Sequence, residues 1–194
     1  MITAITGTIG SGKSLVGNIL RENGKTVFDC DKINAELLSD KKYLDGLKKL
    51  FPYAFPDNKF DKKLFSQRIF GDKAEREKLN DYAHPQIFNR LQVLLAGCED
   101  EDCFVEIPLL KDEFLPLFDR VAVVDADESV RIRRIEKRDG VDTATAKAKV
   151  AAQKCRSDYG IPTVIIKNNL GKKELADTVF STLLCKKELF YTSI

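Results

Sequence analysis

The feature that most constrains this sequence is the octapeptide at residues 7–14, which reads Gly-Thr-Ile-Gly-Ser-Gly-Lys-Ser. It matches the pattern G-x-x-x-x-G-K-[ST] at every fixed position. An apolar run at residues 2–6 precedes it, and an amphipathic stretch at residues 13–23 follows it. Strand, glycine-rich turn and helix in this order predict a loop whose backbone N–H groups surround a phosphate. A glycine-rich turn that only begins a helix is disfavoured, because motif and context agree.

Each fixed position of the motif has a physical role. The glycines let the backbone N–H groups turn inward without a Cβ collision, and the helix N-terminus adds a partial positive charge. We expect Lys13 to reach the β- and γ-phosphates of ATP and the Ser14 hydroxyl to be a ligand of Mg²⁺. The predicted nucleotide-binding residues are Thr8, Ile9, Gly10, Ser11, Gly12, Lys13, Ser14 and Leu15.

Apolar runs alternate with helical patterns along the rest of the chain. Further strands are expected at residues 25–30, 103–107, 121–125 and 163–167. Strands separated by helices predict right-handed crossovers and a parallel sheet covered on both faces. The predicted fold is therefore an α/β three-layer sandwich of the P-loop NTPase type.

Two helical regions interrupt this alternation. Residues 33–95 contain no strand pattern and predict a helical insertion that holds a phosphate acceptor. Residues 131–159 are basic and then alanine-rich, which predicts a helical arm. We expect one domain of 194 residues, with its core at 1–32, 96–137 and 160–194, the acceptor-binding region at about 33–95 and a lid at about 138–159.

Two carboxylates, Asp29 and Asp31, lie at the C-terminal end of the second expected strand. Ligands bind at the carboxyl ends of parallel strands, and residues two apart on a strand project to the same side. One carboxylate could then accept a proton from an attacking hydroxyl while the other orients it or holds Mg²⁺ through water. The alternative is that these residues end the strand and cap a helix that starts near Lys32.

Another acid is expected to hold a metal-bound water. Glu106 closes the strand at 103–107, and Asp125 closes the strand at 121–125. Asp125 is followed by Asp127, Glu128 and Ser129, a pattern typical of a helix start, so Glu106 is the preferred candidate.

Basic residues gather on the expected helix of the arm. Arg134 and Arg138 are four positions apart and share one face, where guanidinium groups can stabilise the charge of a transferring phosphoryl group. Arg131 and Arg133, taken alone, are expected on a solvated helix face. His84, the only histidine, precedes Pro85, and this pair predicts a junction between two helices.

Composition excludes several classes of protein. The net charge is +2, which requires neither a nucleic acid nor an anionic membrane as a partner. No apolar run reaches the ~18 residues that span a bilayer, and the strand at residues 2–6 leaves no room for a targeting peptide. Five scattered cysteines without a C-x-x-C pair favour reduced thiols in the cytoplasm.

In combination these segments resemble the dephospho-CoA kinase family over nearly the whole chain. The residues that carry the resemblance are Ile9 to Ser14, Asp29-Cys30-Asp31, Arg68-Ile69-Phe70, His84-Pro85 with Ile87, Ile107-Pro108-Leu109-Leu110, Arg134 to Asp139, and Ala151-Ala152-Gln153. Thr8 departs from the family, which usually has a glycine at this position. Leu170 also departs, since it stands where the family has glycine in a loop that borders adenine.

The resemblance implies phosphorylation of the 3′-hydroxyl of dephospho-CoA by MgATP, which gives CoA and ADP. It implies Asp31 as the general base, Lys13 as a catalytic residue, and Arg138, with Arg134 beside it, as lid arginines. Asp31, His84 and Leu109 are then expected to bind the acceptor. The expected protein is a cytoplasmic monomer or weak homo-oligomer that binds small molecules.

Two other functions compete with this one. Residues 58–61 read Asn-Lys-Phe-Asp and match the guanine-reading N-K-x-D of nucleotide switches, but no buried strand precedes them and the chain has no D-x-x-G. We therefore reject a non-catalytic switch. The remaining alternative is another P-loop small-metabolite or nucleoside monophosphate kinase.

Overall fold

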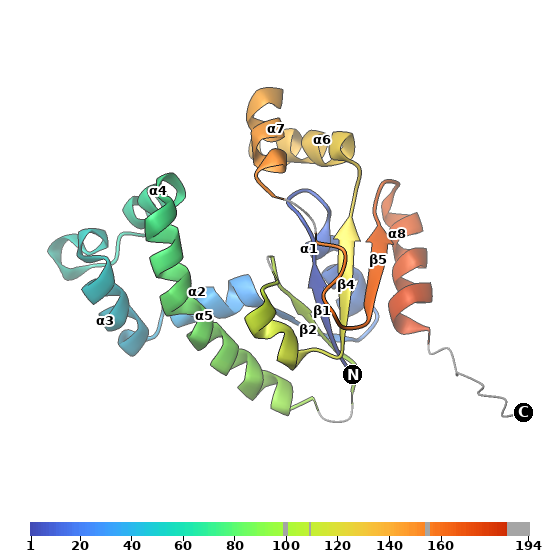
Figure 1. Ribbon diagram of the computed structural model, residues 1–194, viewed down its shortest axis with the longest axis horizontal. Helices are drawn as coiled ribbons and strands as arrows, with labels where there is room; N and C mark the ends of the chain where they lie inside the picture. Colours follow the sequence, from blue (N-terminus) through green and yellow to red (C-terminus); the bar gives the residue numbers. More distant parts are fainter. Residues whose placement is uncertain (99–100, 109, 154–155, 186–194) are drawn as a thin grey trace, which may run out of the picture. The chain divides into compact units, whose positions relative to one another are not determined.

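The computed structural model describes residues 1–98, 101–108, 110–153 and 156–185. Its central element is a five-stranded sheet in the order β2–β3–β1–β4–β5 (Figure 1). The strands are β1 (Ile2–Thr6), β2 (Thr26–Asp29), β3 (Cys103–Glu106), β4 (Arg120–Asp125) and β5 (Thr163–Lys167). β1 pairs in parallel with β3 and β4, and β4 pairs in parallel with β5.

The five strands lie where the sequence predicted them, with ends shifted by at most one residue. All five run parallel and helices flank the sheet, so the predicted fold class is confirmed. The helices are α1 (Lys13–Glu22), α2 (Cys30–Leu37), α3 (Lys41–Leu50), α4 (Lys62–Gly71), α5 (Lys73–Ala96), α6 (Glu128–Asp139), α7 (Thr143–Ala151) and α8 (Lys172–Val179).

The contacts divide the chain into two compact units. One unit comprises Met1–Phe28 and Asp100–Ile194, and the other comprises Asp29–Glu99. The second unit includes the insertion predicted at residues 33–95, and residues 33–95 contain helices and 3₁₀ turns without a strand. The assignment of all 194 residues to one domain, with a lid at 138–159, stays a prediction.

The core of the first unit lies between the sheet and two helices, α1 and α8. Ile5, Phe104 and Ile166 from three strands pack with Leu20 of α1 and Leu175 of α8. Each of these side chains is at most 2% exposed, and burial of one such side chain contributes about 1.5–3 kcal/mol. This packing fixes the start of α1 relative to the end of β1, where the glycine-rich loop lies.

The second unit is organised by aspartate caps and aromatic packing. Asp40, Asp61 and Asp72 accept backbone N–H bonds at the starts of α3, α4 and α5. The ring of Phe51, which is fully buried, meets the Phe65 ring edge to face, 5.3 Å apart. The insertion therefore has a small hydrophobic core of its own.

The junction predicted at His84 is wrong. α5 continues without interruption from Lys73 to Ala96 and contains Pro85 in its interior. Proline removes one backbone donor, but Ala83, Ile87 and Leu91 are buried on the adjacent turns. Their burial stabilises the helix across the proline, an effect that local sequence rules do not include.

Candidate active site

The glycine-rich loop connects β1 to α1 and has a backbone that only glycine adopts easily. Gly10 and Gly12 have φ angles of 78° and 96°. A Cβ on Gly7 would lie 2.1 Å from the carbonyl oxygen of Val124, and one on Gly12 would lie 2.2 Å from Nδ2 of Asn168. Three of the loop's glycines are therefore required by its shape and by the close approach of its neighbours.

The inner side of this loop has the chemistry of an anion site. No side chain caps α1 at Gly12, so the helix N-terminus is open to a ligand. The Ser11 hydroxyl is buried and has no hydrogen-bond partner among the described residues. Lys13 Nζ donates to the carbonyl oxygen of Gly7 at 3.0 Å, which holds its charge at the loop. These groups fit the phosphates of ATP.

The outer side of the loop is held by Asn168 and Arg134. Asn168 Nδ2 donates to the carbonyl oxygen of Ser11 at 2.7 Å, and Asn168 Oδ1 accepts from Arg134 Nη2 at 3.2 Å. Arg134 Nη1 also donates to the carbonyl oxygens of Gly10 and Ser11, both at 3.3 Å. Burial lowers the pKa of the Arg134 guanidinium. The resemblance implied that the loop around Leu170 borders adenine, but no local signal predicted the contact of Asn168 with Ser11, because 157 residues separate the two.

Two residues of the arm bind the first half of the loop. Arg131 Nη1 donates to Thr8 Oγ1 at 3.0 Å, and the backbone N–H of Ile9 donates to Gln153 Oε1 at 2.8 Å. The Ile9 side chain packs on the cluster between α6 and α7. The prediction that Arg131 lies on a solvated helix face is therefore wrong, whereas Arg133 is exposed as predicted.

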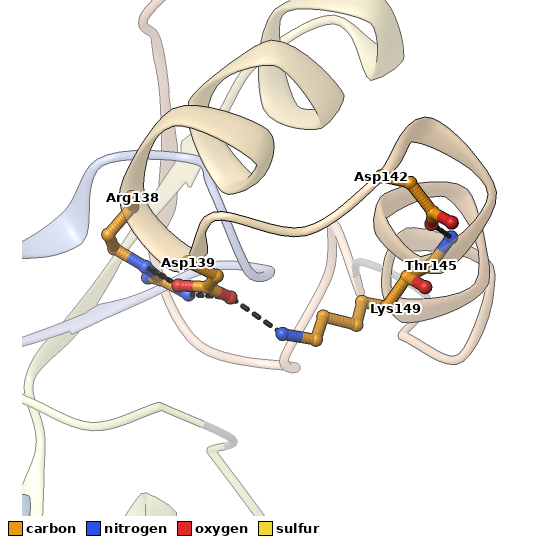
Figure 2. A network of polar contacts seen from close by, with 5 residues as sticks. All are labelled: Arg138, Asp139, Asp142, Thr145 and Lys149. Atoms are coloured by element: carbon orange, nitrogen blue, oxygen red, sulfur yellow. Dashed lines mark hydrogen bonds and ion pairs between the residues drawn. The ribbon is translucent and has the colours of Figure 1, made fainter.

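Arg138 lies at the end of α6 and forms a network within the arm (Figure 2). Its Nε and Nη2 donate to the Asp139 carboxylate at 2.6 and 3.2 Å, and Lys149 Nζ reaches the same carboxylate at 2.6 Å. The hydrogen bond from Arg138, with that from Lys149, holds the pKa of Asp139 well below its usual range. The Asp142 carboxylate caps α7 and also has a lowered pKa, because it accepts from the Thr145 N–H.

The two carboxylates after β2 do not share one side of a strand, so that part of the prediction is wrong. β2 ends at Asp29, whose Oδ1 accepts from the N–H groups of Asp31 and Lys32 at 2.9 and 3.3 Å. Asp29 is thus the N-cap of α2, and Asp31 lies exposed in the first turn of that helix. The alternative of a helix cap is confirmed for Asp29, and the role of Asp31 as general base stays a prediction.

Glu106 closes β3 as predicted but pairs with a cation of α1. Its Oε1 lies 3.0 Å from Arg21 Nη2, and its side chain is 6% exposed. The carboxylate also lies directly against Gly17, where a Cβ would come within 1.9 Å of Oε1. Asp125 likewise pairs with Lys167 Nζ, at 2.5 Å. This geometry favours a structural role for Glu106 over the predicted contact with a metal-bound water.

The remaining predicted site residues are placed as follows. Ser14 is exposed in the first turn of α1, and the N–H of Leu15 donates to the carbonyl oxygen of Gly12 at 3.0 Å. His84 is partly buried within α5, in the second unit. Leu109 lies outside the described residues.

In the described parts of the chain, no three His, Cys, Asp or Glu side chains gather as a metal site. None of the described helices is long and apolar enough to span a membrane. None of the four described cysteines is in a disulfide.

The sheet order, the loop between β1 and α1, and the arginine-bearing arm that contacts this loop define a P-loop kinase. The same fold occurs in a shikimate kinase from Acinetobacter baumannii, with 16% identity and a TM-score of 0.59 over 96% of this chain and 94% of that one. The family model for dephospho-CoA kinase matches residues 1–174. The chain therefore belongs to the dephospho-CoA kinase family.

Individual relatives agree with this assignment. A dephospho-CoA kinase from Vibrio cholerae is 31% identical over 196 residues, which cover 97% of this chain and 95% of the relative. The crystal structure of TT1252 from Thermus thermophilus is 29% identical and has a TM-score of 0.79, covering 95% of this chain and 96% of that one. A dephospho-CoA kinase structure from Campylobacter jejuni, 23% identical over 94% of this chain and 95% of that one, shares the fold with a TM-score of 0.66.

Proposed function

We propose that this chain transfers the γ-phosphoryl group of ATP to the 3′-hydroxyl of the dephospho-CoA ribose, giving CoA and ADP. This reaction is the final step of coenzyme A biosynthesis. Family membership over residues 1–174 carries the proposal. The open N-terminus of α1, the Ser11 hydroxyl and Lys13 support it, because together they provide donors for a polyphosphate.

Each residue of the site would have a separate role in this reaction. Residues 8–15 bind the nucleotide, and Lys13 stabilises charge on the β- and γ-phosphates. The Ser14 hydroxyl would hold Mg²⁺, which neutralises phosphate charge when bound. Arg138 would exchange its contact with Asp139 for the transferring phosphoryl group. His84 and Leu109 would contact the acceptor.

Asp31 would act as the general base. Its carboxylate takes the proton of the 3′-hydroxyl while the oxygen forms a bond to the γ-phosphorus. The bond between that phosphorus and the β–γ bridging oxygen breaks, and ADP leaves with the electron pair. Asp31 suits this role because it is exposed and because Asp29, not Asp31, provides the helix cap.

The acceptor is tested by parallel assays. Dephospho-CoA, AMP, CMP and shikimate are offered with MgATP, and the products are weighed by mass spectrometry. We expect dephospho-CoA to be phosphorylated in preference to the other three. Preferred turnover of another acceptor would instead support a different P-loop small-metabolite or nucleoside monophosphate kinase.

The base is tested by Asp31→Asn with Asp29→Asn as its matched control. Asparagine at position 29 keeps an oxygen that caps α2, so this variant should retain turnover. Asp31→Asn should bind ATP normally and lose turnover by at least ~10²-fold, which is typical for loss of a general base. Near-normal turnover of Asp31→Asn would place the base elsewhere.

A further inference from the structure

The phosphate-binding loop touches the arm through three consecutive residues. Thr8 accepts a hydrogen bond through its hydroxyl, and Ile9 donates one through its backbone N–H. Gly10 lies against the backbone of Arg131, where an added Cβ would come within 2.9 Å of the carbonyl oxygen. The loop is thus supported from the arm as well as from its own strand and helix.

Arg131 is the centre of this support. Its Nη1 donates to Thr8 Oγ1 at 3.0 Å, and its Nε donates to the carbonyl oxygen of Ala126 at 3.1 Å. The guanidinium therefore links the loop after β1 to the connection between β4 and α6. The hydrogen bond to Thr8 holds the charge of Arg131 beside the loop.

Thr8 is suited to receive this donor. It is 3% exposed, and its carbonyl oxygen accepts from the Ser11 N–H at 3.1 Å, which closes a tight turn within the loop. A buried hydroxyl that loses a charged donor loses one of the stronger hydrogen bonds in proteins. The turn that orients the following N–H groups is therefore tied to the arginine through one side chain.

We propose that Arg131 is a positioning residue for ATP, which acts through Thr8 to hold the phosphate-binding loop in its nucleotide-binding shape. The proposal rests on the proposed kinase function. Arg131 contacts the loop through the Thr8 side chain and holds the loop in place before ATP binds. ATP therefore loses less binding free energy to the ordering of the loop. The effect falls on ATP and ADP, and it leaves the affinity for dephospho-CoA unchanged.

The test removes either partner of the hydrogen bond and compares conservative variants. Thr8→Val has the same shape without the hydroxyl, Thr8→Ser keeps the hydroxyl, and Arg131→Met keeps the length without the charge. Arg133→Met is the matched control, because Arg133 lies exposed on the same helix. The dissociation constants for MgATP and MgADP are measured by calorimetry, and the KM values for ATP and for dephospho-CoA by steady-state kinetics.

We expect Thr8→Val and Arg131→Met each to weaken MgATP binding about fivefold to tenfold, a fraction of the roughly 10- to 150-fold that a whole hydrogen bond to a charged group represents. The double variant should be no weaker than either single one, because both remove the same contact. Thr8→Ser should restore most of the affinity, and Arg133→Met should match the wild type. The KM for dephospho-CoA should stay constant throughout.

Several results would overturn the proposal. Unchanged MgATP affinity in Thr8→Val or Arg131→Met would do so, as would fully additive losses in the double variant. A fall in melting temperature with normal affinity of the folded protein would show that the contact serves stability alone. A wild-type protein that binds MgATP but does not phosphorylate dephospho-CoA would contradict the proposed function while leaving this inference standing.

Discussion

Asn168 offers the sharpest test of how the phosphate-binding loop is held. The side chain is 2% exposed and donates to the carbonyl oxygen of Ser11 at 2.7 Å. It also accepts from the Arg134 guanidinium at 3.2 Å. Asn168→Ala removes both hydrogen bonds and leaves the backbone of β5 and its following turn in place.

The magnitude follows from these two contacts. The neutral hydrogen bond contributes about 1 kcal/mol and the one from the charged guanidinium about 1.5–3 kcal/mol. Part of this lost free energy is recovered, because Arg134 Nη1 still donates to the Ser11 carbonyl oxygen at 3.3 Å. We therefore expect a loss of about 2 kcal/mol in the free energy of unfolding, or roughly 4–8 °C in melting temperature for a chain of this size.

Thermal unfolding with and without MgATP measures the effect. We expect Asn168→Ala to melt earlier and to gain less stability from MgATP than the wild type, because the loop loses support. Asn169→Ala is the matched control, since Asn169 lies next in the chain and its Oδ1 accepts from the Asp127 N–H at 2.7 Å, away from the glycine-rich loop. If both variants melted at the same temperature and bound MgATP equally, the reasoning about Asn168 would be refuted.

Two further predictions concern contacts within the first unit. Gly17→Ala should lower the free energy of unfolding, measured in urea, by about 3–5 kcal/mol, because the added Cβ would displace the buried Glu106 carboxylate from Arg21. Unchanged stability of this variant would contradict the packing of Glu106 on Gly17. Asp139→Asn should lower the melting temperature at pH 7. Because the pKa of Asp139 is lowered in the folded protein, its contribution to the free energy of unfolding is complete above the pKa of the unfolded chain, which is about 4. This contribution is lost as the pH falls below that pKa. The difference between wild type and Asp139→Asn should therefore shrink below about pH 4, and a difference that stayed constant with pH would exclude the contribution of this carboxylate.

The sequence predicted what depends on local pattern. The five strands and the loop at residues 7–14 follow from apolar runs, glycines and helix signals that are contiguous in the chain. The helical insertion followed in the same way from the lack of a strand pattern. These features need no knowledge of distant residues.

The errors arose where tertiary contacts decide the outcome. Local rules end a helix before Pro85, yet buried neighbours carry α5 through it. The sequence around Arg131 does not predict a contact partner for its side chain, because Thr8 is brought next to it by the tertiary fold. The contact of Asn168 with Ser11 was not predicted for the same reason, because the two residues are 157 positions apart. For Asp29 and Asp31 the exact end of β2 decided which carboxylate is the cap, and strand ends are the least predictable part of a pattern.

The strand order has a consequence for the way this chain is made. β1 and β2 precede the other three strands in the sequence, but they are not neighbours in the sheet, since β3 lies between them. Ile2 pairs with Cys103, so neither early strand has a partner until the whole insertion has been synthesised. The insertion, in contrast, is continuous in sequence and makes its contacts within residues 29–99. A nascent chain that stops before β3 would expose two unpaired apolar strands, and this stage of synthesis is where aggregation would begin.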